Sequence, residues 1–465
     1  MEGMSLAEVA EALRSELIAD DDVSETCPTG GCTDSRQVGP GELFFALRGE
    51  RTDGHRFVEV AFERGAAAAV VAQDWYRAQA PDARPRGTLI PVAAPDLAMG
   101  DLARVYRRRF DIPVVGITGS NGKTTTKDMA AAVLRTRYCV LATQGNLNTR
   151  LGVPLTLFNL CRAHEVAVVE MGISELGGMR YLCEIAHPTV GVITNIGPTH
   201  LAFLGSVEGV AKAKGELLEN MDESSMAILN LDDLLLSKER AKLKGRLLGF
   251  GVEKICQFRG ERLVLDQEGC GHFSLQSHSF HLSVPGRHNV YNALAAAAVG
   301  SALGVPLPDA ARALASFRPG KLRSQVLERN GIRLLNDAYN ANPASMRAAL
   351  ETLAQITVSE GGRRVAVLGD MLELGAAEVE AHRALGAAAA EMGIDTIFAF
   401  GILSRETAVG GIAGGLPPER SRAFADQDDL VAQVKDFLQP GDLALLKGSR
   451  GMAMEAVARA LGFEG

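Results

Sequence analysis

Basic tracts and long apolar runs are both missing from this sequence of 465 residues. Without a stretch rich in lysine and arginine, and with a formal net charge of −8, the chain is not expected to bind nucleic acid. No apolar run approaches the roughly 18 residues that a membrane-spanning helix needs, and the N-terminal MEGMSLAEVAEALRSEL carries acidic residues in a helical pattern. We therefore expect neither a membrane span nor a signal peptide.

Closely spaced cysteines are rare as well. The seven cysteines are scattered, and the close pair Cys27 and Cys32, in CPTGGC, lacks a second pair or a neighbouring histidine that would complete a zinc site. Free thiols in a reducing compartment explain this pattern, so we expect a cytoplasmic protein. Nothing in the sequence demands an oligomer, and we expect a monomer.

The composition is that of an ordinary globular protein, with 47% apolar and 22% charged residues, and it changes in character twice along the chain. Residues 1–111 begin with a short helix and end in the loop-rich stretch APDARPRGTLIPVAAP, followed by the basic helix LARVYRRRF. The boundaries fall near residues 111 and 320, which gives three regions: 1–111, 112–319 and 320–465.

The second and third regions repeat a pattern of buried strand, turn and helix. The predicted strands are VVGIT, VAVVEMG, VGVITNIG and MAILNLDD in the second region, and IRLLND, RVAVLGD, DTIFAFG and LALLKGS in the third. Continuous apolar strands that alternate with helices predict parallel sheets covered on both faces. The predicted fold class is therefore α/β with open sheets.

Ligands of open parallel sheets bind beyond the carboxyl ends of the strands. Polar residues that directly follow the predicted strands are therefore the first candidates for a site. They are residues 118–124, Glu170, residues 195–200, Asp337 and Lys447.

Residues 116–127, GITGSNGKTTTK, form a candidate phosphate loop between a strand and a helix. Its glycines let backbone N–H groups turn toward one anion, and the helix N-terminus adds a partial positive charge. Lys123 is predicted to reach the β- and γ-phosphates, and the Thr124 hydroxyl to hold Mg²⁺. The spacing departs from GxxxxGK(S/T), because Ile117 stands where the first glycine belongs. The alternative is a glycine-rich turn without a ligand, which the strand–loop–helix context disfavours.

Four further residues have more than one interpretation. Glu170 ends a buried strand, where a carboxylate needs a partner such as Mg²⁺, a cation or a helix N-terminus. His200 follows the next strand and is either a metal ligand or structural. Lys212 and Lys214 lie two apart on a predicted helix, so at most one faces the site, and two surface lysines are the simplest interpretation.

Five segments, taken in order along the chain, resemble the Mur ligases: GITGSNGKTTT, VVEMG, NIGPTHL, AKAKGELL and GRHNVYNALAAAAV. The resemblance implies ATP-dependent amide-bond formation in peptidoglycan precursor synthesis. It also implies three domains: a small α/β domain for the UDP-sugar (1–111), a central P-loop ATPase-type domain (112–319) and a C-terminal Rossmann-like domain for the incoming dipeptide (320–465).

Other segments resemble one branch of the family, which joins D-alanyl-D-alanine to UDP-N-acetylmuramoyl-tripeptide. They are TDSRQVGPGELFFALRGERTDGH, TQGNLNTRLGVPLTL, NDAYNANPASMRAAL, VLGDMLELG and KGSRGMAME. The neighbouring branch adds the third residue and carries an Asp-Asn-Pro-Arg type motif for a diamino acid, which is missing here. One departure from the branch is Thr149, where a second Asn would follow Asn148.

The resemblance implies roles for many of the strand-end residues. Catalytic roles fall to Lys123, His200, Lys214 and Arg323. Mg²⁺ binding falls to Thr124, Glu170, His200 and Lys214, with Lys214 carbamylated. Such a carbamate forms on a neutral amine, which burial near other cations favours. ATP contacts are implied for Gly119, Ser120, Asn121, Gly122, Lys123, Thr124, Thr125, Asn289, Asn292, Arg323 and Asp337.

Substrate contacts are implied in all three regions. They fall to Ser35, Arg36, Asp53, Gly54 and His55 at the uridine end, to Asn146 and Asn148 in the centre, and to Tyr339, Asn340, Asn342, Lys447 and Ser449 in the C-terminal region. Without the family, Asn289 is predicted to cap a helix, as is Ser449. TDGH and the polar stretch before Pro343 are then simple turns.

Three rival interpretations stay open. They are a related ligase for a diamino acid or for folate and glutamate, a non-catalytic nucleotide-binding regulatory subunit of the same fold, and a plain P-loop ATPase switch. The GNLN, NANP and LGDMLELG segments argue against the first. The joint presence of Lys123, Thr124, Glu170, His200 and Lys214 argues against the second, and the displaced glycine of the loop argues against the third.

Overall fold

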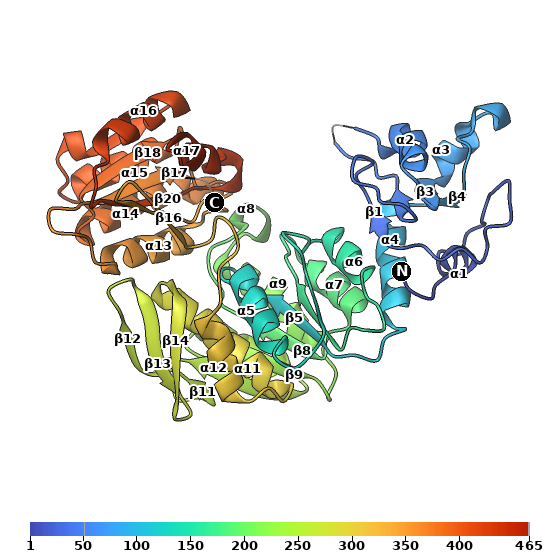
Figure 1. The fold of residues 1–465 in the computed structure, drawn as a ribbon, viewed down its shortest axis with the longest axis horizontal. Helices are drawn as coiled ribbons and strands as arrows, with labels where there is room; N and C mark the ends of the chain where they lie inside the picture. The colour runs from blue at the N-terminus through green and yellow to red at the C-terminus, as the bar shows by residue number, and fades with distance from the viewer. Residues whose placement is uncertain (51, 464–465) are drawn as a thin grey trace.

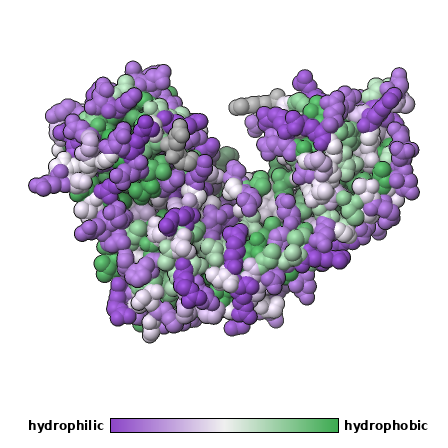
Figure 2. Space-filling view, in the orientation of Figure 1, coloured by the Kyte–Doolittle hydropathy of each residue, from purple (hydrophilic) through white to green (hydrophobic). Residues whose placement is uncertain are grey.

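The computed structural model describes residues 1–50 and 52–463, which form three bodies, each built on a largely parallel sheet (Figure 1). The N-terminal and C-terminal bodies stand as two arms on the central body, and an open notch separates the arms in the space-filling view (Figure 2). The predicted three-domain α/β fold is confirmed. Within the described part of the chain, no helix combines the length and the apolarity that crossing a membrane requires.

The N-terminal body carries a four-stranded parallel sheet in the order β1-β2-β3-β4. Its elements are α1 (Leu6–Ala12), β1 (Gly31–Cys32), β2 (Leu43–Phe45), α2 (Val58–Glu63), β3 (Ala68–Ala72), α3 (Gln73–Ala78) and β4 (Leu89–Val92). The loop-rich stretch of residues 80–95 also contains β4. Pro91 is accommodated there because β4 is an edge strand, where a missing N–H leaves no neighbour unpaired.

Helix α4 (Pro95–Arg107) joins the N-terminal and central bodies through a shared apolar core. Its buried face packs on α6 (Gly152–Leu157) and α7 (Gly178–Ala186) of the central body. Phe45 of β2 stacks on Phe158 after α6, with ring centroids 5.7 Å apart. The buried Arg107 guanidinium donates to the carbonyl oxygen of Ala186 at 3.2 Å. These two bodies are therefore fixed to one another by packing.

The central body is a seven-stranded parallel sheet in the order β11-β10-β9-β8-β5-β7-β6. Apolar clusters cover both faces, as the continuous apolar strands predict. The strands are β5 (Val114–Thr118), β6 (Val140–Ala142), β7 (Val166–Glu170), β8 (Val190–Ile193), β9 (Met226–Asn230), β10 (Arg246–Gly251) and β11 (Phe258–Arg259). The helices besides α6 and α7 are α5 (Lys123–Leu134), α8 (Leu201–Leu204), α9 (Val207–Glu219), α10 (Leu234–Glu239), α11 (Arg287–Ala302) and α12 (Leu307–Ala315).

A small antiparallel sheet, which the sequence analysis did not foresee, follows the central strands. It consists of β12 (Glu261–Leu265), β13 (Cys270–Leu275) and β14 (His278–Pro285). Its inner side chains, such as Phe273 and Phe280, are buried in the same cluster as α11, while the outer ones are exposed. These strands alternate between buried and exposed side chains and contain no continuous apolar run. The pattern that predicts parallel strands is therefore missing from them.

The C-terminal body is a six-stranded sheet in the order β15-β16-β20-β17-β18-β19, in which only β15 runs antiparallel to its neighbour. Its elements are β15 (Gln325–Arg329), β16 (Ile332–Asn336), α13 (Pro343–Gln355), β17 (Arg364–Gly369), α14 (Glu378–Glu391), β18 (Thr396–Phe400), α15 (Ser404–Ala413), β19 (Ser421–Phe424), α16 (Gln427–Phe437), β20 (Leu443–Lys447) and α17 (Glu455–Ala460). None of the buried apolar clusters found among the described residues joins this body to the central one.

Helices α14 and α15 approach so closely that glycine is needed on both. A Cβ on Gly386 would lie 1.9 Å from the carbonyl oxygen of Thr407, and a Cβ on Gly410 would lie 2.0 Å from that of Arg383. We expect Gly386→Ala to destabilise the C-terminal body by about 1–3 kcal/mol, because the two helix backbones must separate. Calorimetric unfolding measures the effect. Gly320→Ala is the control, since its added carbon meets nothing nearer than 4.0 Å, and equal stability of both variants would contradict the argument.

Candidate active site

A cavity of about 1200 Å³ lies where the central and C-terminal bodies meet. The carboxyl ends of β5, β7 and β8 form one wall, and the segments around β16, α13 and β20 form the other. The strand-end residues that line it are Ser120, Asn121, Gly122, Lys123, Thr124, Glu170, Asn195, Ile196, Gly197, His200, Asp337 and Lys447. The rule that ligands bind beyond strand ends thus brings together residues from two separate sheets.

The phosphate loop connects β5 to α5 and is shaped by two glycines with positive φ. Gly119 (φ 143°) and Gly122 (φ 80°) leave no room for a side chain, since a Cβ would lie 1.9 Å from Thr194 Oγ1 or 2.3 Å from Asn292 Oδ1. The Asn121 N–H donates to Asn195 Oδ1 at 2.9 Å, which ties the loop to the segment after β8. The loop is therefore held in a turned conformation by its neighbours.

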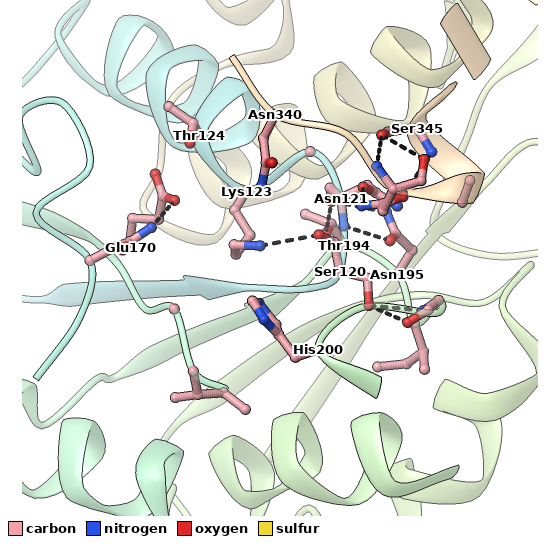
Figure 3. Close-up of a pocket in the computed structure, with 18 of the residues that line it drawn as sticks. Ser120, Asn121, Lys123, Thr124, Glu170, Thr194, Asn195, His200, Asn340 and Ser345 are labelled. Atoms are coloured by element: carbon pink, nitrogen blue, oxygen red, sulfur yellow. Dashed lines mark hydrogen bonds between the residues drawn. The ribbon is translucent and has the colours of Figure 1, made fainter. Parts of the chain in front are cut away.

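Lys123 begins α5 and folds back over the loop (Figure 3). Its Nζ donates to the carbonyl oxygens of Gly119 at 2.8 Å and Ser120 at 3.2 Å. Removal from bulk water lowers the pKa of the Lys123 ammonium; the charge of Glu170 opposes this and that of Arg323 adds to it. A phosphate bound at the loop would supply an anion to this partly buried cation.

Glu170, at the end of β7, has one carboxylate oxygen without a partner. The side chain is 1% exposed, and Oε1 accepts from Asn148 Nδ2 at 2.7 Å. Oε2 is buried and has no hydrogen-bond partner among the described residues. Such an oxygen is costly to bury unless something binds it. The salt-bridge interpretation fails, because no ion pair within 4.0 Å joins Glu170 to a cation among the described residues.

The residues around Glu170 fit a hard cation such as Mg²⁺. The free Oε2 and the buried Thr124 hydroxyl are oxygen ligands of the kind that Mg²⁺ prefers, and Mg²⁺ typically completes its shell with phosphate and water. Among the described residues, no group of three or more His, Cys, Asp or Glu side chains forms a ready metal site. A metal here would therefore depend on the Glu170 oxygen, on the Thr124 hydroxyl and on nucleotide oxygens.

Lys214 is buried on α9, and this overturns the interpretation of two surface lysines. Its side chain is 1% exposed, whereas Lys212 is exposed. Burial first, and then the charge of Lys123, hold the pKa of the Lys214 ammonium well below its ordinary value of 10.5. A neutral amine in this position is able to react with an electrophile such as CO₂.

His200 precedes α8 in the left-handed conformation, with φ 53°. Its Nδ1 lies 3.0 Å from Glu373 Oε2 of the C-terminal body. Burial lowers the pKa of the imidazole, the charge of Glu373 raises it, and the charges of Lys214 and Lys123 lower it further. The net direction is downward, which favours the neutral ring that a metal ligand requires.

The two asparagines of α11 occupy unequal positions. Asn292 lines the cavity and accepts from Thr126 Oγ1 at 3.1 Å, while Asn289 lies behind it and accepts from Asn292 Nδ2 at 2.9 Å. The alternative prediction that Asn289 caps the helix is wrong, because Gly286 is the residue at that position. Asn289 lies in the first turn of the helix, and its Nδ2 donates to the carbonyl oxygen of Pro285 at 2.7 Å.

The C-terminal wall is an interlocked polar cluster. The Arg323 guanidinium lies 3.8 Å from the centroid of the Tyr339 ring. Asp337 accepts from the Ser324 N–H at 2.9 Å and from Lys447 Nζ. Lys447 also donates to the Asn340 carbonyl oxygen at 2.9 Å. Each of these side chains except that of Ser324 belongs to the predicted site, and all of them line the cavity.

Asn342 both caps a helix and lines the cavity, and its contact with substrate stays a prediction. It caps α13 through a capping box with Ser345, as the turn before Pro343 predicts. It also lines the cavity, and its Nδ2 donates to Asn121 Oδ1 of the phosphate loop at 2.7 Å. Ser449 does neither. It does not line the cavity and makes no side-chain cap; its buried Oγ accepts from the Leu372 N–H at 2.9 Å.

Asn146 and the five predicted residues of the N-terminal body lie apart from this cavity. Asn146 is exposed, whereas Asn148 lines the cavity beside Glu170. Arg36 is exposed and paired with Asp34, and this pair lowers the pKa of the Asp34 carboxyl to about 2. None of the five predicted substrate contacts of the N-terminal body lines the cavity; they are Ser35, Arg36, Asp53, Gly54 and His55.

His55 serves the local fold. Its Nε2 accepts from the Ala72 N–H at 2.8 Å, at the end of β3, and its Nδ1 pairs with Asp53 at 2.5 Å. Gly54 is close-packed, since a Cβ there would lie 2.7 Å from the backbone of Leu47. The TDGH stretch is therefore a rigid turn, and its contact with a uridine stays a prediction.

Three family models match successive parts of the chain. They are the Mur ligase family, catalytic domain, over residues 30–107, the Mur ligase middle domain over 117–300, and the Mur ligase, glutamate ligase domain over 322–450. The UDP-N-acetylmuramoyl-tripeptide–D-alanyl-D-alanine ligase of Bacillus subtilis (strain 168) is 37% identical, with 97% of each chain covered. The chain belongs to the Mur ligase family. The relative of the same name from Escherichia coli (strain K12) is 35% identical over 99% of each chain.

Solved Mur ligase structures share the whole fold. MurF from Acinetobacter baumannii superposes with a TM-score of 0.86 at 31% identity, covering 97% of each chain. MurF ligase from Thermotoga maritima, solved in complex with ADP, superposes with a TM-score of 0.79 at 28% identity, covering 93% of this chain and 96% of that one. The resemblance found in the sequence is confirmed, and the chain is an ATP-dependent ligase.

Glu373 also lines the cavity, although it was not among the predicted site residues. Glu373 lies in VLGDMLELG, four residues beyond the end of β17, and so it does not directly follow a strand. Its partner His200 is 173 residues away in the chain. The only sequence signal was that Glu373 lies in a segment typical of the Mur ligase branch.

Lys214 generates a test on stability. The unfolded chain binds a proton on this amine below pH 10.5, whereas the folded chain resists it, so the wild type loses stability as the pH falls from 10.5 toward the folded pKa. We expect Lys214→Met to raise the melting temperature at pH 7 by on the order of a few degrees. This gain should shrink as the pH approaches 10.

The measurement is thermal unfolding in CO₂-free buffer, with Lys212→Met as the matched control, since that side chain is exposed. A Lys214→Met protein that melts below the wild type at pH 7, while Lys212→Met does not, would refute the assigned burial penalty.

Proposed function

We propose that this Mur ligase joins D-alanyl-D-alanine to UDP-N-acetylmuramoyl-tripeptide and converts ATP to ADP and phosphate. The observation that carries the proposal is that relatives matching 97–99% of the chain, at 35–37% identity, bear the name of this activity. The product would be the UDP-muramoyl-pentapeptide of peptidoglycan synthesis, made in the cytoplasm by a monomer.

The three bodies receive separate tasks in this proposal. Residues 1–111 bind the uridine nucleotide, residues 112–319 bind ATP, and residues 320–465 bind the incoming dipeptide. The assignment is supported by the phosphate loop at residues 116–127 and by the polar cluster of Arg323, Asp337 and Lys447, which faces the loop across the cavity.

The reaction proceeds in two steps. The tripeptide carboxylate attacks the γ-phosphorus of ATP, which gives an acyl phosphate and ADP. The dipeptide amine then attacks the acyl carbon, the amide bond forms, phosphate leaves, and the amine proton is lost to solvent. Lys123 and Arg323 lie where they would offset the negative charge that builds up on the transferred phosphoryl group.

Mg²⁺, when bound, would neutralise phosphate charge. Thr124, Glu170, His200 and a carbamylated Lys214 would hold it. The carbamate forms when the neutral Lys214 amine attacks CO₂ and releases a proton, so a buried neutral amine becomes an anionic oxygen ligand. Support comes from the lowered pKa of Lys214 and from the unpartnered Oε2 of Glu170.

Paired substrates test the proposed function. Purified protein with ATP and Mg²⁺ receives either UDP-N-acetylmuramoyl-tripeptide with D-alanyl-D-alanine, or UDP-N-acetylmuramoyl-dipeptide with lysine or diaminopimelate, and phosphate release is measured. We expect turnover in the first tube only. Turnover in the second alone would move the protein to the branch that adds the third residue, and silence in both with ATP bound would favour the regulatory subunit.

Chemical rescue tests the carbamate. Lys214→Ala should reduce turnover by on the order of 100-fold or more, because the metal loses an oxygen ligand. Short carboxylic acids such as acetate should restore part of it by filling the vacated space. Lys212→Ala serves as the control and should retain full activity. An undiminished Lys214→Ala enzyme would rule the carbamate out.

A further inference from the structure

The contact between His200 and Glu373 joins the two bodies that enclose the cavity. His200 follows β8 of the central sheet, and Glu373 follows β17 of the C-terminal sheet. The two side chains meet with Nδ1 3.0 Å from Oε2, and both residues line the cavity. The ring of His200 projects toward Lys123 in the close-up view (Figure 3).

Both residues are held in backbone conformations that non-glycine residues seldom adopt. His200 has φ 53° and Glu373 has φ 65°. A left-handed conformation is unfavourable for either residue, so the surrounding structure must impose it. Two such residues facing one another across the boundary between the central and C-terminal bodies indicate that the fold maintains this contact.

The loop that carries Glu373 is fixed on both sides. The Met371 N–H donates to His382 Nε2 at 3.0 Å, and the Leu372 N–H donates to Ser449 Oγ at 2.9 Å. Met371 is fully buried and Leu374 is 4% exposed, so the loop is anchored before and after Glu373. The Glu373 side chain, which is 58% exposed, projects from this anchored loop. This also gives Ser449 a role: it holds this loop.

The carboxylate decides which nitrogen of His200 carries the proton. A carboxylate only accepts hydrogen bonds, so the ring must place its proton on Nδ1 to donate to Glu373. The Nε2 atom is then left with a free lone pair for a metal ligand role. Carboxylates beside metal-binding histidines commonly fix tautomer and ring orientation in this way, and their loss weakens metal binding about 10–100-fold.

We propose that Glu373 is the positioning residue for His200, and that the metal site of the central body is completed only when the C-terminal body supplies this carboxylate. The inference rests on the proposed role of His200 as a metal ligand. Metal affinity and placement of the C-terminal body are then linked, because whatever stabilises one stabilises the other.

Mn²⁺ binding measured by electron paramagnetic resonance tests the inference without turnover. The full-length protein is saturated with ADP, and free Mn²⁺ is titrated for the wild type and for Glu373→Ala, Glu373→Gln, His200→Ala and the double variant Glu373→Ala/His200→Ala. We expect Glu373→Ala to weaken the His200-dependent Mn²⁺ site by about tenfold or more. The amide of Glu373→Gln can still accept from Nδ1, so its loss should be smaller.

The double variant separates positioning from direct ligation. If Glu373 acts through His200, removing Glu373 changes nothing further once His200 is gone. An equal additional loss in the double variant would make Glu373 a ligand in its own right and overturn the proposal. Unchanged Mn²⁺ affinity in Glu373→Ala would overturn it as well. Glu380→Gln, an exposed glutamate on α14, is the matched control and should bind Mn²⁺ as the wild type does.

The outcome is independent of the substrate assignment. If the protein turned over no muramoyl substrate and yet showed the His200-dependent loss, the proposed function would fail while the positioning role held. If the protein turned over tripeptide and dipeptide normally while Glu373→Ala bound Mn²⁺ like the wild type, the reverse would hold.

Discussion

The burial of unneutralised charge at the carboxyl edge of the central sheet governs this molecule. The charge of Glu170 acts on the pKa of Lys123, and the charge of Lys123 acts on that of Lys214, while Glu170 keeps one buried oxygen without a hydrogen-bond partner among the described residues. Without a ligand, the protein offers these groups too few polar partners to replace water, which is energetically unfavourable. A nucleotide polyphosphate and a divalent cation would supply the missing opposite charges. The site is therefore built for ligands that bring charge with them.

The two arms are attached to this edge by different forces. The N-terminal arm shares an apolar core with the central body through α4 and the Phe45–Phe158 stack. The C-terminal arm has its own cores and meets the loop and the metal-ligand candidate through hydrogen bonds, Asn342 to Asn121 and Glu373 to His200. Apolar packing gives a fixed support, while a few polar contacts can be exchanged with water at little net cost. The C-terminal arm is therefore held to the central body less tightly than the N-terminal arm is.

Much of this was accessible from the sequence, and the failures have physical causes. Continuous apolar strands are strong signals, so the parallel sheets, the phosphate loop and the strand-end residues of the cavity were predicted. Short strands with alternating burial, such as β12–β14, give weak signals. The burial of Lys214 could not be derived from helical spacing alone, which only limited the choice to one of two lysines. Asn289 and Ser449 look like caps because their residue types favour caps, but here both act as supports for neighbours.

Contacts across bodies are the class that sequence reasoning cannot reach, and in this chain they are the ones that complete the site. An acyl phosphate survives only where water is excluded, and closure of the C-terminal arm over the central sheet would exclude it. Closure over a charged edge is unfavourable until the charges there are matched. If Glu373 orders His200, and His200 binds the cation that accompanies ATP, closure and charge matching become one event. The chain would then form its enclosed site when the nucleotide is present and reopen when ADP and phosphate leave.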